Sequence, residues 1–290
     1  MGESQRATVR HAARITRSRA RSFYLSSLFL PASIRRDVYI MYAYYRAVDD
    51  LVDDPPAGWT RARICAELRQ WSNVIAGIDA PASPLMGEVA RVIRARGVQP
   101  KCAALVIEGA LLDLDRTEIT TREELLRYAY LVAGSVGMVM ARILGANGRD
   151  ALGAAADLGI AMQITNIVRD VAEDLDRSRV YLPSDAMQRH GCSMDALRSR
   201  QATPGFRAVM EELVGEAERH YETGTAGIAH LQPRIQFAIY LAARLYSGIL
   251  RKVVKRNYDV FSERAHVGLL EKWANVVPAY LELRKARLHL

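Results

Sequence analysis

The chain has 290 residues, half of them hydrophobic and a quarter charged, with a formal net charge of +8 at pH 7. This length can bury a large core, and the composition is that of a globular protein rather than a disordered one. Neither aromatic stacking platforms nor a known nucleic-acid module accompanies the scattered basic residues, so nucleic-acid binding is not expected.

No apolar signal segment opens the sequence, and the longest apolar run, near residues 129–141, ends at Arg142 before it could span a bilayer. The three cysteines lie far apart without a metal-ligand spacing, which argues against a disulfide framework or a zinc site. Basic residues cluster near both ends of the chain. We therefore expect a cytoplasmic protein, with weak peripheral contact to an anionic membrane surface as a further hypothesis.

The pattern of prolines and apolar residues predicts an all-α fold. Most of the ten prolines fall between segments whose apolar residues recur every three to four positions, and no sustained strand-like alternation occurs. The predicted helices span residues 6–22, 32–54, 60–77, 84–97, 100–116, 121–147, 150–177, 204–226, 233–256 and 266–288. The long irregular stretch at 178–203 is expected to form a functional rim or lid. Without repeats or linkers, residues 1–290 are interpreted as one domain.

The first acidic pattern lies at the end of the helix predicted over 32–54. Arg46, Asp49, Asp50 and Asp53 fall within an arc of ~100° on this helix. Carboxylates crowded at a helix C-terminus repel one another and oppose the helix dipole. Taken alone, this string fits a solvated helix end as well as it fits a binding site.

The second acidic pattern forms a polar stripe on the otherwise apolar helix predicted over 150–177. Gln163, Asn166, Asp170 and Asp174 lie on one side of this helix. Burying such groups without partners costs several kcal/mol, so the stripe needs a cation, a ligand or a water-filled cavity beside it.

Each acidic pattern places two aspartates one helical turn apart, as Asp49/Asp53 and as Asp170/Asp174. Oxygen ligands with room for water suit Mg²⁺, which prefers to bind through carboxylates together with substrate phosphates. Two such helices facing one another would clamp a diphosphate, and the ionised substrate would need an apolar cavity. The small and apolar run at 132–138 is a candidate lining, although close helix–helix packing explains the same residues.

These residues together resemble the phytoene/squalene synthase family over nearly the whole chain. The matching segments occur in the family's order: Arg21 to Phe23, Tyr42 to Asp53, Glu108 to Asp113, Tyr128 to Gly137, Gln163 to Pro183, and Asn257 to Lys272. The resemblance implies an isoprenoid-synthase helical bundle around a central cavity, with the two acidic patterns on opposite walls.

The resemblance also implies roles for individual residues. Metal–diphosphate ligands would be Asp49, Asp53, Asn166, Asp170 and Asp174, supported by Asp50 and Glu173. Diphosphate contacts would be Ser22, Arg46, Gln163, Arg169, Arg264 and Lys272, and cavity residues near the cation would be Tyr42, Tyr128 and Tyr246. Many relatives carry Ser or His just before the basic residue of the first segment, where this chain has Ala20. One phosphate or hydroxyl contact of the second substrate site is therefore lost or is replaced by Arg21. Lys272 would be a surface lysine unless its helix folds over the site.

The implied reaction is the head-to-head coupling of two prenyl diphosphates through a cyclopropylcarbinyl diphosphate. Two geranylgeranyl diphosphates would give phytoene with Mg²⁺ or Mn²⁺ and without NADPH. Alternatives are a farnesyl-diphosphate enzyme that makes presqualene diphosphate, dehydrosqualene or squalene, a class I terpene cyclase, and a non-catalytic helical protein on membranes. The sequence leaves the oligomeric state open.

Overall fold

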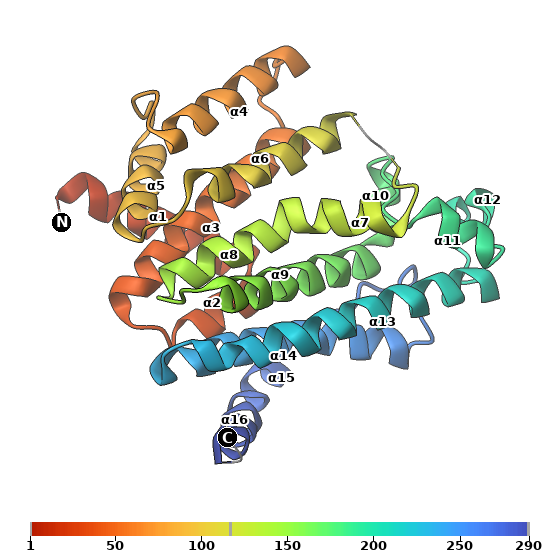
Figure 1. Cartoon of the computed structure of the whole chain (residues 1–290). Coiled ribbons are helices and arrows are strands. Elements are labelled where there is room, and N and C mark those ends of the chain that lie inside the picture. The colour runs from red at the N-terminus through yellow and green to blue at the C-terminus, as the bar shows by residue number, and fades with distance from the viewer. Residues whose placement is uncertain (1, 116–117, 289–290) are drawn as a thin grey trace.

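A computed structural model describes residues 2–115 and 118–288, and these residues form a helical bundle (Figure 1). Within these ranges no strand forms, and a single isolated bridge joins Glu118 and Val180. The all-α prediction is confirmed.

The helices follow one another in three groups along the chain. The first contains α1 (Glu3–Arg19), α2 (Arg21–Ser27), α3 (Ala32–Asp53), α4 (Arg61–Ala76), α5 (Pro84–Ala95) and α6 (Pro100–Asp115). The second contains α7 (Arg122–Ala129), the π-helical turn η1 (Tyr130–Gly134), α8 (Ser135–Ile143), α9 (Arg149–Arg169) and α10 (Val171–Asp176). The third contains α11 (Ser184–Arg189), α12 (Met194–Arg198), α13 (Pro204–Ala226), the 3₁₀ turn η2 (Gly227–His230), α14 (Pro233–Lys255), α15 (Leu269–Ala274) and α16 (Val276–Leu288).

The helix predicted over 150–177 is interrupted at Asp170, which separates α9 from α10. The backbone of Asp170 has φ −102° and ψ 15°, outside the helical region. Its N–H still donates to the Asn166 carbonyl at 2.8 Å, and the N–H of Asp174 donates to the Asp170 carbonyl at 2.9 Å. Because the break leaves both backbone hydrogen bonds intact, it needs no proline or glycine to mark it in the sequence.

Three other predicted helices are also divided. The helix at 6–22 ends at Arg19 and restarts after Ala20, whose φ of −132° is not helical. The helix at 121–147 contains the π turn η1, and the helix at 266–288 starts at Leu269 and is divided at Asn275. The stretch at 178–203, expected to be irregular, contains α11 and α12. Helices of five or six residues are too short to show apolar periodicity in a sequence window.

Helix α9 runs through the bundle and packs against α8, α13 and α14 (Figure 1). Two glycines allow this close approach: a Cβ on Gly137 would lie 2.0 Å from the Ala155 carbonyl oxygen, and one on Gly159 would lie 2.2 Å from that of Ala133. Among the described residues, α9 is the helix long and apolar enough to meet the composition of a membrane span. Its packing against three neighbours explains that apolar character.

The apolar core consists of two clusters. One is built largely on α3 to α6, and the other on α9, α13 and α14. Ile239 on α14 packs against both clusters. This contact links the two clusters, and the interpretation of residues 1–290 as one domain stays a prediction.

Candidate active site

A cavity of about 480 Å³ lies between the ends of α3, α6, α9 and α10. The polar stripes of α3 and α9–α10 both face it, because the apolar sides of these helices are buried in the core. The predicted site residues that line this cavity are Arg46, Asp49, Asp53, Tyr128, Gln163, Asn166, Arg169, Asp170, Glu173, Asp174 and Arg264. Segments that are separate in the sequence therefore meet at one cavity.

Two carboxylates on different walls of the cavity are the least compensated. Burial raises the pKa of Asp49 to about 7, although water in the cavity reaches its side chain. Burial, followed by the nearby Asp170 carboxylate, raises the pKa of Asp174 to about 7. Neither forms an ion pair within the described part of the chain. Both groups therefore favour a cation that enters the cavity.

The other aspartate of each pair, Asp53 or Asp170, forms ion pairs with arginines. Asp53 accepts hydrogen bonds of 2.6 Å from Arg177 Nη1 and from Arg179 Nη1, which joins the end of α3 to the segment after α10. Asp170 accepts hydrogen bonds from Arg169 Nε at 2.6 Å and from Arg264 Nε at 2.8 Å. Arg177 and Arg179 were not among the predicted site residues. The basic run directly after the acidic stripe is the sequence signal that could have identified them.

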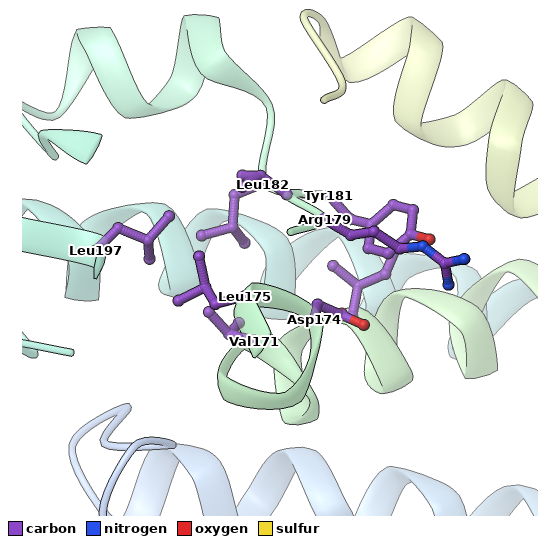
Figure 2. A pocket seen from close by; sticks show the side chains of 9 residues that line it. Val171, Asp174, Leu175, Arg179, Tyr181, Leu182 and Leu197 are labelled. Carbon is purple, nitrogen blue, oxygen red and sulfur yellow. The ribbon is translucent and has the colours of Figure 1, made fainter. Parts of the chain in front are cut away.

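The segment after α10 has polar side chains on the side of the cavity and apolar side chains on the opposite side. Figure 2 shows Asp174, Arg179 and Tyr181 on one side of this segment, with apolar side chains packed on the other. The apolar side includes Val171, Leu175, Leu182 and Leu197. Anchoring by these side chains fixes the direction of Arg179 and Tyr181 toward the cavity.

Two tyrosines share one carboxylate at the inner wall of the cavity. Tyr128 and Tyr181 each donate a hydrogen bond of 2.9 Å to Asp113, one to each carboxylate oxygen, and their rings stack at 5.0 Å. Burial, with the neighbouring Asp113 carboxylate second, raises the pKa of Tyr128 well above its usual value. The Tyr128 hydroxyl therefore stays protonated, and Asp113 orients it. Asp113 lay inside a matching segment but was given no role from the sequence.

The cavity donors fit a hard divalent cation. Asn166 Oδ1 is buried without a hydrogen-bond partner, and Asp49 and Asp174 are carboxylates without a paired cation. Oxygen donors of this kind suit Mg²⁺. Within residues 2–115 and 118–288, no three His, Cys, Asp or Glu side chains converge closely enough to hold a metal ion by themselves.

The remaining predicted residues lie outside the cavity lining. They are Arg21, Ser22, Tyr42, Asp50, Tyr246 and Lys272. Asp50 pairs with Arg46. Tyr42 stacks on Phe23 at 5.7 Å, and burial, then the neighbouring Tyr246, raises the pKa of Tyr42 to about 12.

Lys272 is 9% exposed, so the alternative of a surface lysine is wrong, and its predicted role as a diphosphate contact stays a prediction. Burial, and then the neighbouring Arg21, lowers the pKa of the Lys272 ammonium. Among the described residues no carboxylate pairs with Lys272. Two cations without a carboxylate between them form a candidate anion site.

The run at 132–138 serves both of the purposes considered for it. Val132 lines the cavity, whereas Gly134 and Gly137 lie against α9. The π turn η1 carries Val132 directly after α7, where Tyr128 is located. Such turns inside helices are frequent at functional sites.

These features define a helical enzyme that holds anionic substrates between two acidic walls. A family model described as "Squalene/phytoene synthase" matches residues 16–271, so the chain belongs to this family of prenyltransferases. Membership confirms the family resemblance and the isoprenoid-synthase fold predicted from the sequence. Members of this family generally use Mg²⁺, in keeping with the oxygen donors in the cavity.

Similar proteins support this assignment along the whole chain. A phytoene synthase of Thermus thermophilus is 38% identical over 276 residues, which cover 93% of this chain and 92% of that protein. A 15-cis-phytoene synthase of Synechocystis is 33% identical over 283 residues, covering 92% and 82%. The crystal structure of a dehydrosqualene synthase in complex with ligand is 29% identical, with a TM-score of 0.88 over 97% of this chain and 98% of that one.

Proposed function

We propose that this chain is a phytoene synthase that joins two geranylgeranyl diphosphates head to head. One substrate loses pyrophosphate, its allylic cation adds to a double bond of the other, and loss of a proton closes the ring of a cyclopropylcarbinyl diphosphate. Loss of the second pyrophosphate and of a proton then gives the C40 hydrocarbon. The observation that carries this proposal is the 38% identity, over almost the whole of both chains, to a phytoene synthase.

Arginines of the cavity supply the contacts for diphosphate. Arg177, Arg179 and Arg264 present guanidinium groups that hold carboxylates of Asp53 and Asp170. A guanidinium fork binds phosphate oxygens with the geometry it uses for a carboxylate. Diphosphate entry would transfer these arginines from aspartate to phosphate, and the released carboxylates would become available to a metal ion.

Metal ligands would be Asp49, Asp53, Asn166, Asp170 and Asp174. When bound by these residues, Mg²⁺ would supply positive charge that stabilises the departing diphosphate. Arg46 and Gln163 border the same cavity and would hold the diphosphate in place. Replacement of Mg²⁺ by Mn²⁺ is part of this proposal.

The tyrosine pair is proposed to guide the carbocation. Tyr128 and Val132 line the same cavity as the acidic residues, and the Tyr128 hydroxyl donates to Asp113. The faces of aromatic rings attract cations. We assign the proton loss to the departing pyrophosphate as base, so the reaction would not require NADPH.

The exposed Arg21 and the buried Lys272 are proposed as a contact for the second diphosphate. Their positive charges lie close enough that Arg21 lowers the pKa of Lys272. An anion between them would relieve this repulsion. Arg21 would thus fill the role left by Ala20.

The product is a water-insoluble hydrocarbon, so the proposal includes a cytoplasmic enzyme with weak peripheral contact to a membrane. A farnesyl-diphosphate enzyme is the second candidate, because a dehydrosqualene synthase matches the fold with a TM-score of 0.88. Family membership removes the terpene cyclase and the non-catalytic protein as alternatives.

The test is an incubation of the purified protein with Mg²⁺ and either geranylgeranyl or farnesyl diphosphate, with and without NADPH. Lipid products are identified by mass spectrometry. A C40 hydrocarbon formed without NADPH supports the proposal, whereas a C30 product or presqualene diphosphate establishes the second candidate. Asp49→Asn and Asp170→Asn are expected to abolish most turnover, and Asp176→Asn serves as control because Asp176 is 63% exposed.

A further inference from the structure

The outer side of α15 and α16 is covered by large apolar side chains that meet solvent. Their exposed fractions are Leu269 66%, Leu270 87%, Trp273 52%, Val277 64%, Tyr280 53% and Leu281 50%. At about 100° per residue, the three residues of α15 fall within one arc of about 100°, and so do the three residues of α16. We call these six residues the outer apolar face.

The inner side of the same helices combines polar contacts with the fully buried Ala279 of the core. Glu271 of α15 pairs with Lys252 of α14, and Glu282 of α16 pairs with Arg244. Asn275 accepts a hydrogen bond of 2.9 Å from Arg244 Nε. A helix on the surface of a water-soluble protein normally turns its apolar side toward the core. Here the polar contacts dock the helices on α14, whereas the six apolar side chains stay at least half exposed, Tyr280 touching α14 through Phe237.

The outer apolar face continues onto the end of α2. The ring of Tyr280 meets that of Phe237 on α14 edge to face at 5.7 Å, and Phe237 meets Phe29 in the same way at 4.8 Å. Leu28 and Phe29 are themselves 39% and 38% exposed. Helix α16 extends from the bundle on the far side of α14 from α9 (Figure 1). A contiguous apolar surface of this kind marks an interaction site.

Charge distinguishes between the possible occupants of this surface. The two carboxylates described on α15 and α16, Glu271 and Glu282, are engaged with α14. Arg251, close to Glu271, and Arg284 and Lys285 at the end of α16 are exposed. Unbalanced positive charge beside an apolar surface repels a second copy of the same surface and attracts anionic lipid headgroups.

We propose that the outer apolar face inserts into the headgroup–acyl boundary of an anionic bilayer. The arrangement is that of an interfacial amphipathic helix, with apolar side chains directed outward and basic residues beside them. Only the role of this membrane contact rests on the proposed function. That role would be to bring the enzyme close to membrane-dissolved prenyl substrate and hydrocarbon product. Helix α15 connects the outer apolar face with the candidate anion site. Trp273 is half exposed on that face, while the adjacent Lys272 is buried beside Arg21.

The test is flotation of the full chain, without substrate, on phosphatidylcholine vesicles with and without phosphatidylglycerol. The triple variant Leu270→Ser, Trp273→Ser, Leu281→Ser is expected to lose about tenfold or more of its partition onto anionic vesicles. Ile78→Ser is the matched control, since Ile78 is 73% exposed in the turn after α4. Thermal unfolding of each variant establishes that the fold is kept.

Fluorescence places the insertion at one side chain. Wild-type emission is expected to shift to the blue on anionic vesicles, and Trp273→Phe should float normally but lose most of this shift. Wild-type protein that does not float, or a triple variant that floats as well as wild type, would overturn the inference. So would a concentration-dependent dimer in sedimentation velocity that the triple variant abolishes, because the surface would then bind a second copy. Each result is independent of substrate turnover, so a failed product assay leaves it standing.

Discussion

Replacing Asp174 with asparagine should make the metal-free protein more stable and the enzyme less active. Burial raises the pKa of Asp174 from 3.8 to about 7, and the neighbouring Asp170 carboxylate adds to this effect. The folded state therefore binds a proton more tightly at this position than the unfolded state does. By linkage, the stability of the wild-type protein falls as pH rises from about 4 to about 7. Asparagine has no such proton to lose.

The size of the effect follows from the shift. Three pKa units correspond to ~4 kcal/mol at pH 8, at 1.36 kcal/mol per unit. Water in the cavity screens part of this, so we expect Asp174→Asn to gain ~2–3 kcal/mol at pH 8. The gain should shrink as pH falls and be nearly absent below about pH 3, where both states of the wild-type protein are largely protonated.

Urea unfolding in EDTA at several pH values measures this directly. Turnover with Mg²⁺ should fall by about a hundredfold or more in the same variant, since a proposed metal ligand is removed. Asp176→Asn is the control on the same helix: Asp176 is 63% exposed and pairs with Arg200, so its loss should change stability by less than ~1 kcal/mol. If Asp174→Asn unfolded at lower urea than wild type at pH 8, the account of this carboxylate would be refuted.

Three further predictions concern residues elsewhere in the structure. Asp113→Asn should lower turnover at least about tenfold with little change in KM, because the acceptor that orients two tyrosine hydroxyls is weakened; steady-state kinetics checks this, and an unchanged kcat contradicts it. Arg122→Ala should destabilise the fold by ~2 kcal/mol in urea, because Glu216 is 5% exposed and loses a two-point ion pair; equal stability would mean that other cations suffice. Gly137→Ala should lower the melting temperature by the equivalent of ~3 kcal/mol, since its Cβ would meet a backbone carbonyl of α9, whereas Gly153→Ala, with open space around it, should be neutral or stabilising.

Local patterns in the sequence identified much of the site. Helical spacing alone places Asp49 with Asp53, and Asn166 with Asp170 and Asp174, because residues three or four apart share one side of a helix. The same spacing identified the helices of the bundle, apart from breaks at residues such as Asp170 where the backbone hydrogen bonds continue. The family resemblance then supplied the expectation that the two stripes lie on opposite walls.

Contacts between distant segments required the tertiary structure. Asp113 and Tyr181 are 68 positions apart, and Asp53 and Arg177 are 124 apart, so no local period relates them. The burial of Lys272 was likewise undecided in the sequence, because it depends on where α15 docks.

The sequence by itself determined that the chain is all-α, that its helices carry two acidic stripes, and to which family it belongs, because these properties reside in local periodicity and in ordered motifs. Tertiary structure alone decided which arginines hold Asp53 and Asp170, which carboxylate holds Tyr128, and which side of α15–α16 meets solvent. Helix packing sets these contacts, since a helix with two different sides can be docked with either one inward until its partners are in place.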